Sequence, residues 1–402
     1  KMRKILLILL VAVCIFAASA DDIAKSFDRI VKDYGYPFEQ HYVTTSDGYI
    51  LKLFRIQHGI KDANETSTNG RPAILIQHGI FDSADFVLTH GPDLSPAFYL
   101  ANAGYDVWVA NSRGNKYSRQ HKTLNPDKDA KFWDFSFADM VNDYKANIEH
   151  VRSETGQTKI AVIGHSQGTS SMYAGLSTDA GWFKDRVSIF VSLGSVARLD
   201  NLTSKLLKFI IETPIVLSTV KKLGIEEMFP SNFLTKSTFI LLCGAIPQIC
   251  QFGAKIIADS DPRVDSSEWA RIYFGHFPSG SSTKCLEHYS QIFLSKKYQS
   301  FDYGAEENMR RYGTRTPPEY PLNKVSVPVA KFTGSSDVLG DAQDNEWLSA
   351  QLAHTLVFDK VYDYGHLSFF IAKDMNYLAD MLEVLRKYHH TNTASEEVGI
   401  SS

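Results

Sequence analysis

The chain has few cysteines, little net charge and a single long apolar run. Its 402 residues include 4 cysteines, and 42 basic residues nearly balance 45 acidic ones, for a formal net charge of -3. Because no block of basic residues occurs, nothing indicates a nucleic-acid partner. The spacing of histidine and cysteine is not that of a metal site, so neither a metal nor another cofactor is expected. Repeats and low-complexity segments are lacking too, whereas the 44% apolar content supports a packed core.

The long apolar run stands near the start of the sequence. The basic residues of KMRK precede ILLILLVAVCIFA, and the small residues ASA come directly before Asp21. This order is typical of a signal peptide, and the run is too short for a comfortable membrane span. We therefore expect cleavage after Ala20, no transmembrane anchor, and entry into the secretory pathway toward secretion or the lysosome. A signal anchor is the less favoured alternative.

Three cysteines remain after such a cleavage. Cys243 and Cys250 are close enough in CGAIPQIC to bridge a short loop, which would leave Cys285 unpaired, although three cysteines permit other pairings. Disulfides agree with the oxidising secretory route. Asn64 and Asn201 begin the sequons NET and NLT and are candidate glycosylation sites.

Strand and helix patterns alternate along most of the sequence. An alternating segment with an Asp47-Gly48 turn predicts a β-hairpin. Apolar strand patterns such as AILIQ, YDVWVA, KIAVI and VSIFVSL follow, separated by helical segments. This order favours an α/β fold with a mainly parallel sheet and helices on both faces.

Residues 200–326 interrupt this order with apolar helical stretches and no clear strand. A long insertion between sheet strands is usually functional, so we interpret it as a mostly helical cap or lid. The strand pattern resumes at VPVAKFTGSSD, and a last helix ends at His389-His390, which we expect to be solvated. The expected parts are a signal peptide (1–20), a core in two segments (21–199 and 327–390), the cap (200–326) and a polar tail (391–402).

The stretch KIAVIGHSQGTSSMY places Ser166 between two glycines, directly after a short apolar strand. If that strand passes into a helix with almost no loop, Ser166 takes a strained backbone conformation. Side chains at Gly164 and Gly168 would then collide with the turn. The hydroxyl would project from the end of the sheet beside a helix N-terminus, which favours developing negative charge. Ser166 is therefore the candidate nucleophile.

A serine nucleophile needs a base to take its proton, and the base needs a carboxylate to hold its tautomer. After a nucleophile of this kind, the acid precedes the histidine, and each follows a strand. Asp337, at the end of VAKFTGSSD, is the candidate acid, and His366, after KVYDYG, is the candidate base. Asp341 and Asp344 are alternative acids, but they lie where a helix has begun, and Asp363 is too close to His366 along the chain.

Charge on the attacked carbonyl oxygen needs two backbone N–H donors. Gln167, at the head of the helix, is one candidate, and Ile80, in the turn HGIF after the AILIQ strand, is the other. The alternative for His78-Gly79 is a tight turn with a packed histidine. We interpret His165, beside the serine, as structural.

The chain resembles the acid lipase family of the α/β-hydrolases, which includes gastric and lysosomal acid lipases. The segments that carry the resemblance occur in family order: YGYPFEQHYVTTSDGYILKLFRI, LIQHGIFDSADFV, LANAGYDVWVANSRGNKYSR, FWDFSFADMVNDY, GHSQGT, GSSDVLGDAQD and YGHLSFF. The resemblance implies the α/β-hydrolase fold and activity on esters of neutral lipids. It also implies these site residues: the triad Ser166, Asp337 and His366, the oxyanion donors Ile80 and Gln167, and a cap disulfide between Cys243 and Cys250.

Three positions depart from the family pattern. Ser368 stands where an acidic residue is usual, Gly365 where asparagine is common, and Gly194-Ser195 where Ala-Pro is common. None of these changes removes a catalytic atom, but they alter the pocket and the surroundings of the histidine.

The expected function is that of a serine lipase which cleaves triacylglycerols or sterol esters at a lipid–water interface. A carboxylesterase for short soluble esters is one alternative. A non-catalytic lipid carrier on the same fold is another, although its expected signature, loss of a triad residue, is absent.

Overall fold

The computed structural model describes most of the chain between residues 22 and 389. The described residues are 22–62, 70–204, 208, 211–212, 219, 222–231, 261 and 263–389. Several sequence predictions lie outside them: the signal peptide (1–20), the polar tail (391–402), Asn64, Cys243, Cys250 and His390. Within the described ranges, every helix is too short or too polar to cross a lipid bilayer.

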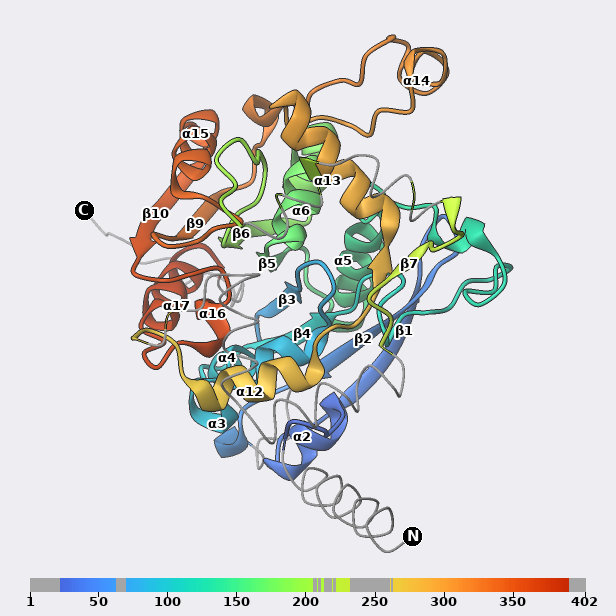
Figure 1. Ribbon diagram of the computed structural model, residues 1–402. Coiled ribbons are helices and arrows are strands. Elements are labelled where there is room, and N and C mark those ends of the chain that lie inside the picture. Colours follow the sequence, from blue (N-terminus) through green and yellow to red (C-terminus); the bar gives the residue numbers. More distant parts are fainter. Residues whose placement is uncertain are drawn as a thin grey trace, which may run out of the picture.

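Eight strands form one sheet in the middle of the molecule (Figure 1). They are β1 (Glu39–Thr44), β2 (Ile50–Ile56), β3 (Ala73–Gln77), β4 (Asp106–Ala110), β5 (Ile160–His165), β6 (Val187–Leu193), β9 (Val329–Gly334) and β10 (Leu356–Tyr362). Their order across the sheet is β1-β2-β4-β3-β5-β6-β9-β10. β2 pairs antiparallel with β1 and with β4, and the other neighbours in this sheet are parallel. The predicted hairpin and the mainly parallel sheet are therefore confirmed.

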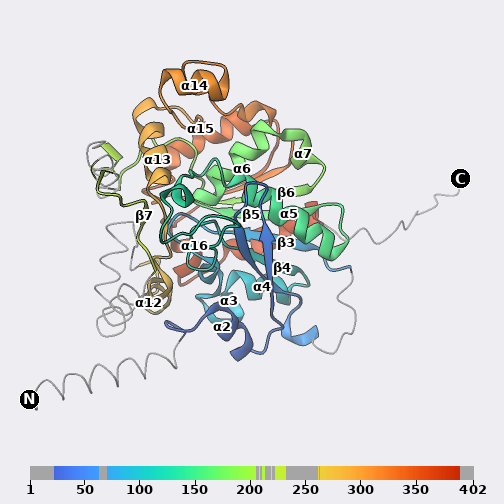
Figure 2. The same cartoon turned by 90° about the vertical axis from the view of Figure 1, so that its right-hand side faces the viewer.

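Helices cover both faces of the sheet because successive strand residues point to opposite sides. On β3, Ile74 and Ile76 belong to one apolar core, whereas Ala73 and Leu75 belong to the other. The first core includes residues of α2 (Phe27–Asp33), α4 (Pro96–Asn102), α16 (Ser368–Ile371) and α17 (Tyr377–Tyr388). The second includes residues of α5 (Val141–Thr155), α6 (Gln167–Thr178), α7 (Ala180–Lys184) and α15 (Ala342–Leu352). Figure 2 shows the resulting layers from the side.

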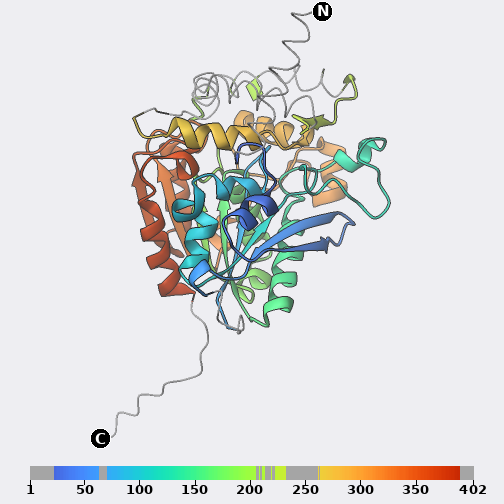
Figure 3. The same ribbon diagram turned by 90° about the horizontal axis from the view of Figure 1, so that it is seen from below.

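The predicted cap falls between β6 and β9. Its described helices are α12 (Ser267–His276), α13 (Thr283–Ser295) and α14 (Ala305–Tyr312). Figure 3 shows α12 running along the outside of the α/β core. No clear strand was expected here, but β7 (Glu227–Met228) and β8 (Ser281–Ser282) form an antiparallel pair. Two-residue strands are too short to produce an alternating pattern in the sequence.

Short elements complete the described chain. They are α3 (Gly91–Leu94) and the 3₁₀ helices Ile60–Asp62, Ala84–Leu88, Ala130–Trp133 and Leu322–Lys324.

The end of α17 differs from the sequence prediction. His389, which was expected to be solvated, is only 3% exposed. Its Nδ1 lies 2.9 Å from the hydroxyl of Ser188 on β6, and its ring stacks 6.2 Å from that of Tyr105. The prediction was wrong because the contact between the amphipathic helix and the sheet extends past Tyr388 to the C-cap residue, His389.

Candidate active site

Ser166 is the single residue between β5 and α6. Its backbone angles, φ 52° and ψ -121°, are strained for a residue with a side chain. A Cβ at Gly164 would lie 3.1 Å from the ring of Phe190. A Cβ at Gly168 would lie 3.0 Å from the main-chain oxygens of both Gln77 and His78. Larger side chains at either glycine would therefore collide with the turn that presents the serine.

The turn after β3 packs directly against Ser166. A Cβ at Gly79 would lie 2.9 Å from the Cβ of Ser166 and 3.3 Å from its Oγ. His78 holds this turn, since its Nε2 accepts the N–H of Ser112 at 3.0 Å and its Nδ1 lies 2.7 Å from the oxygen of Gly79. Burial lowers the pKa of His78 to about 4, so the ring is neutral and Nδ1 donates. The main chain of Ile80 thus follows immediately after the contact with the serine.

The acid and base candidates meet at the carboxyl ends of β9 and β10. Nδ1 of His366 lies 2.8 Å from Oδ2 and 3.0 Å from Oδ1 of Asp337. Both residues are buried, at 2% and 3% exposure. Oδ1 also accepts the N–H groups of Leu339, at 2.9 Å, and Gly340, at 2.7 Å.

These contacts keep the Asp337 carboxyl ionised. Burial raises the pKa of Asp337, but the electrostatic interaction and hydrogen bond with His366 and the two backbone N–H groups together lower it below its ordinary value. An ionised carboxylate accepts the proton on Nδ1 of His366 and so leaves the lone pair on Nε2. The structure therefore gives the imidazole the tautomer that a general base needs.

Nε2 of His366 is buried and forms no hydrogen bond with any described residue. His165, the residue before the serine, contacts the candidate base: its ring centre lies 4.7 Å from that of His366. The Nε2 of His165 donates to the main-chain oxygen of His366 at 3.0 Å. Serine–histidine hydrogen bonds are often long before substrate binds. Ser166 and His366 are thus joined through His165 rather than by a direct bond between their side chains.

The alternative acids are engaged elsewhere. Asp341 is the N-cap of α15, and its side chain accepts the N–H of Gln343 at 2.8 Å. Asp344 accepts two hydrogen bonds from Asn201, one from the backbone N–H at 3.0 Å and one from the side-chain Nδ2 at 2.9 Å. The side chain of Asn201, a candidate glycosylation site, is therefore already hydrogen-bonded. Asp363 accepts the hydroxyl of Ser335 at 3.4 Å. Of the four aspartates considered, it is Asp337 that contacts the imidazole.

The departures from the family pattern surround the acid–base pair. Gly194 has φ 52°, and a Cβ there would lie 3.3 Å from both Oδ2 of Asp337 and Nδ1 of His366. The hydroxyl of Ser368 accepts the N–H of Gly365 at 2.9 Å and so closes the loop that carries the histidine. These small residues allow the main chain to pack tightly around the pair.

An apolar cluster, which the sequence did not reveal, lies beside the turn after β3. Phe81 and Leu286 are buried together, and Ile80, Met228 and Phe277 pack against them. Leu286 comes from α13, Met228 from β7 and Phe277 from the loop after α12. HGIF is the part of this cluster that the sequence marked as a candidate site. Leu286, Met228 and Phe277 belong to the chain between β6 and β9, so no local pattern in the sequence reveals their contact with it.

Cys285 is free and buried, and burial raises the pKa of its thiol to about 11. A protonated, buried thiol is a poor nucleophile, so this cysteine does not compete with Ser166.

Comparison with known proteins places this chain in a family. The model of the partial α/β-hydrolase lipase region matches residues 27–91, and the model of the α/β hydrolase fold matches residues 72–214. Gastric triacylglycerol lipase of Bos taurus is 32% identical over 89% of this chain and 89% of that protein. The Rattus norvegicus enzyme is 36% identical over 87% and 88%, and lipase member K of Homo sapiens is 32% identical over 90% and 91%.

Solved structures share the fold at much lower sequence identity. A soluble variant of monoglyceride lipase from Saccharomyces cerevisiae, in complex with a substrate analogue, aligns with a TM-score of 0.52. The alignment covers 89% of this chain and 98% of that chain, at 14% identity. The expected α/β-hydrolase fold is thereby confirmed.

Proposed function

The chain belongs to the family of α/β-hydrolase lipases that contains the gastric triacylglycerol lipases and lipase member K, and from this premise we propose that it is a serine lipase. It hydrolyses the carboxylic ester bonds of neutral lipids, with triacylglycerols as the first substrate class and sterol esters as the second. The observation that carries the proposal is the buried Asp337–His366 pair, whose loop is hydrogen-bonded to His165, the residue directly before the strained turn of Ser166.

The first chemical step forms an acyl-enzyme. Oγ of Ser166 attacks the ester carbonyl carbon while Nε2 of His366 takes the hydroxyl proton. Asp337 stabilises the imidazolium that results. The tetrahedral oxyanion binds the N–H groups of Ile80 and Gln167. When the intermediate collapses, the imidazolium gives its proton to the leaving alcohol.

The second step releases the fatty acid. Water takes the place of the alcohol, gives a proton to His366 and attacks the acyl carbonyl, after which Ser166 regains its proton. The same two N–H groups stabilise the second oxyanion, so one preorganised site serves both steps.

The apolar cluster beside Ile80 supports a long acyl chain as the group transferred. Phe81 and Leu286 offer apolar contact next to the proposed oxyanion donors. Residues 200–326, as the proposed cap, would cover that chain and exclude water from it. A carboxylesterase for short soluble esters needs no such surface, and a lipid carrier needs no acid–base pair.

The nucleophile is tested by replacing Ser166 with alanine and measuring the hydrolysis of emulsified trioleoylglycerol and of a soluble short-chain ester. We expect both activities to fall by about 10⁴-fold or more. Ser177→Ala is the matched control, because Ser177 lies on the same helix and its hydroxyl donates within that helix, to the oxygen of Ala174. Full activity of Ser166→Ala on both substrates would refute the proposal.

The substrate class is tested on α13. Leu286→Ser should lower trioleoylglycerol turnover more than short-ester turnover, because the long acyl chain loses apolar contact. Leu294→Ser is the control, since Leu294 is 54% exposed on the same helix. A short ester preferred by both the unmodified protein and the variants would favour the carboxylesterase.

We also propose that the protein enters the secretory pathway and is then secreted or delivered to lysosomes. The N-terminal pattern of residues 1–20 supports this route. Sequencing the N-terminus of the mature protein from secreting cells should find Asp21 first. A mature chain that retains residues 1–20 would instead favour the signal anchor.

A further inference from the structure

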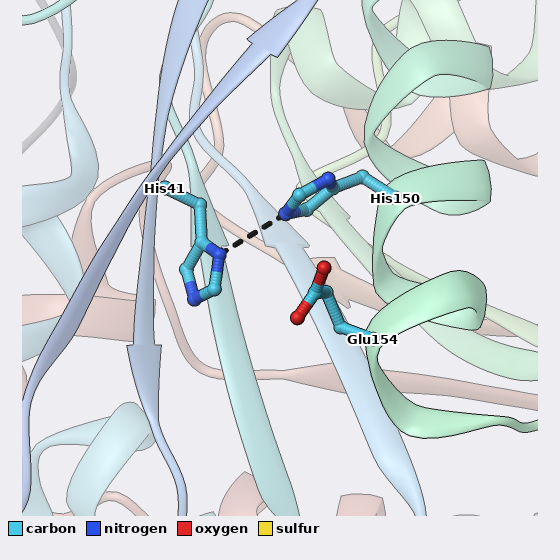
Figure 4. Close-up of side chains that lie close together, drawn as sticks. All are labelled: His41, His150 and Glu154. Atoms are coloured by element: carbon cyan, nitrogen blue, oxygen red, sulfur yellow. Dashed lines mark hydrogen bonds between the residues drawn. The ribbon is translucent and has the colours of Figure 1, made fainter.

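Three side chains with metal-ligating atoms meet at the surface, away from Ser166. They are His41 on β1 and His150 and Glu154 on α5, and their ligating atoms all lie within 4.8 Å of one another. Figure 4 shows one nitrogen of the His41 ring pointing toward one nitrogen of the His150 ring, with the carboxylate of Glu154 beside them. The sequence shows no metal-ligand spacing here, because one of the three residues is more than a hundred positions from the other two.

Regular elements on both sides fix the geometry of this group. His150 and Glu154 are four residues apart on a helix, so they share one face, and α5 packs against β1. The rings of His41 and His150 lie 4.8 Å and 6.0 Å from that of Trp108, which is fully buried. The two imidazoles are therefore held by packing rather than by loops.

Hydrogen bonds leave a lone pair of His41 facing His150. Nε2 of His41 lies 3.2 Å from Oε2 of Glu39, and a carboxylate can only accept, so Nε2 carries the proton. Glu39 is itself held by Arg55, at 2.9 Å, and by Gln57, at 2.7 Å. Histidines that bind metals typically donate their other N–H to a carboxylate in this way.

The distance between the two facing nitrogens fits a shared ion. Nδ1 of His41 and Nε2 of His150 are 3.1 Å apart. Two nitrogens bound tetrahedrally at zinc distances lie about 3.3 Å from each other. In the absence of a metal, His150 donates a hydrogen bond to His41, and metal binding requires only that the proton of His150 moves from Nε2 to Nδ1.

The surrounding charge also favours a cation. Three carboxylates lie in this region, those of Glu39, Glu154 and Asp106. Arg55 brings one guanidinium, which forms ion pairs with Glu39 and Asp106. The carboxylates outnumber the guanidinium, so the local charge attracts a cation.

We propose that His41, His150 and Glu154 form a binding site for one divalent transition-metal ion of the zinc type, with water completing the coordination. Two imidazoles and a carboxylate suit zinc better than magnesium or calcium. The ion would cross-link the edge strand β1 to α5 and so stabilise that edge of the sheet.

This site is separate from the proposed catalytic residues. Tyr144, near the start of α5, donates to the oxygen of Gly168 at 2.8 Å, which places that end of the helix beside the serine. His150 and Glu154 lie about 9 Å and 15 Å farther along the helix axis at 1.5 Å per residue. The metal site and the lipase proposal can therefore fail independently.

The test measures Zn²⁺ binding to the full protein after removal of metals by a chelator and dialysis. Calorimetry should find one equivalent, and Co²⁺ should give the visible absorption bands of a tetrahedral site. His150→Gln, which can still donate to His41, and Glu154→Gln should each weaken binding by at least 10-fold. Glu39→Gln, which removes the support of His41, should weaken it by about 10- to 100-fold.

His58→Gln is the control, because His58 lies outside the cluster and bonds to the main chain, with Nδ1 2.9 Å from the oxygen of Gly59. This variant should bind Zn²⁺ as tightly as the unmodified protein, and Zn²⁺ should raise the Tm of both but not that of His150→Gln. Circular dichroism checks that each variant is folded, and Glu154 is exposed, so its replacement leaves the core intact. The proposal is overturned if one-equivalent binding is absent, or if it persists unchanged in both His150→Gln and Glu154→Gln.

Discussion

Nε2 of His165 lies 3.0 Å from the main-chain oxygen of His366, so the residue before the proposed nucleophile is hydrogen-bonded to the loop that carries the proposed base. Burial lowers the pKa of His165 to about 3, so its ring is a neutral, fixed donor across the pH range of folded proteins. The sequence interpretation of His165 as structural agrees with this contact. The contact also makes His165 a positioning residue for His366.

Removing this contact should slow catalysis without weakening substrate binding. We expect His165→Phe to lower kcat by about 10- to 100-fold, since displacement of a catalytic group by about 1 Å has effects of this size, while KM for a short ester stays nearly unchanged. His288→Phe is the control, because His288 is also buried and its Nε2 bonds to a main-chain oxygen, that of Gln299, at 2.9 Å. Equal losses of kcat in both variants would indicate general destabilisation instead.

The acid is separated from its alternatives by single substitutions to asparagine. Asp337→Asn should lower kcat by about 10⁴-fold, because an amide no longer fixes the tautomer of His366. Asp341→Asn should leave kcat and stability nearly unchanged, since asparagine caps helices as well as aspartate does. The measurement is ester hydrolysis together with thermal unfolding. Loss of activity in Asp341→Asn alone would exclude the assignment of Asp337.

Gly194 tests how tightly the main chain encloses the acid–base pair. Gly194→Ala should destabilise the fold by about 1–2 kcal/mol, the cost of a left-handed conformation for a residue with a Cβ. It should also lower kcat, because the new methyl group would press on Asp337 and His366 at 3.3 Å. Gly181→Ala, in α7, is the control, because a Cβ there meets nothing within 4 Å. Urea unfolding and ester hydrolysis measure the two effects.

The contribution of Asp82 to the free energy of unfolding should be larger near pH 4 than near pH 7. Burial raises its pKa to about 7, although Tyr273 and the N–H of Ser83 oppose the shift. A carboxyl group with a raised folded-state pKa binds its proton more tightly when folded. Its stabilisation is complete below about pH 4 and is lost as the pH rises to about 7. Asp82→Asn should remove this contribution. Between pH 4 and pH 7 the free energy of unfolding should therefore lose this contribution in the unmodified protein but not in the variant.

Urea unfolding of the unmodified protein and of Asp82→Asn at both pH values measures this difference. Buried neutral histidines act in the opposite sense: His78, with its pKa lowered to about 4, loses stabilising energy as the pH falls. Its effect is present in both proteins and cancels in the comparison. Asp93→Asn, at an exposed position, is the control. An identical pH dependence in Asp82→Asn and the unmodified protein would mean that Asp82 has the same proton affinity folded and unfolded.

Local patterns in the sequence predicted most of the core. The apolar strand before Ser166 and the glycines around it predict the strand–turn–helix geometry, because sterics at a tight turn act between near neighbours. The order of Asp337 and His366 after their strands was equally readable, since parallel strands bring their carboxyl ends to one edge. These inferences depend on residues within a few positions of each other and on one general rule of topology.

The remaining features depend on contacts between distant parts of the chain. The apolar cluster of Phe81 with Leu286, the burial of His389 against β6, and the approach of His41 to α5 all join elements far apart in the sequence. His150 and Glu154 are four residues apart on α5, but no pattern in the sequence relates them to His41 on β1. The two-residue pair β7–β8 is likewise set by tertiary packing.

The position of β9 and β10 at the far edge of the sheet has a consequence for biosynthesis. The six strands from β1 to β6 precede them in the chain and pair with one another without them. A polypeptide still emerging from the ribosome can therefore present Ser166 on its finished turn while Asp337 and His366 remain unmade. Translation of about the last sixth of the chain, which carries both residues, would then be needed to complete the proposed triad.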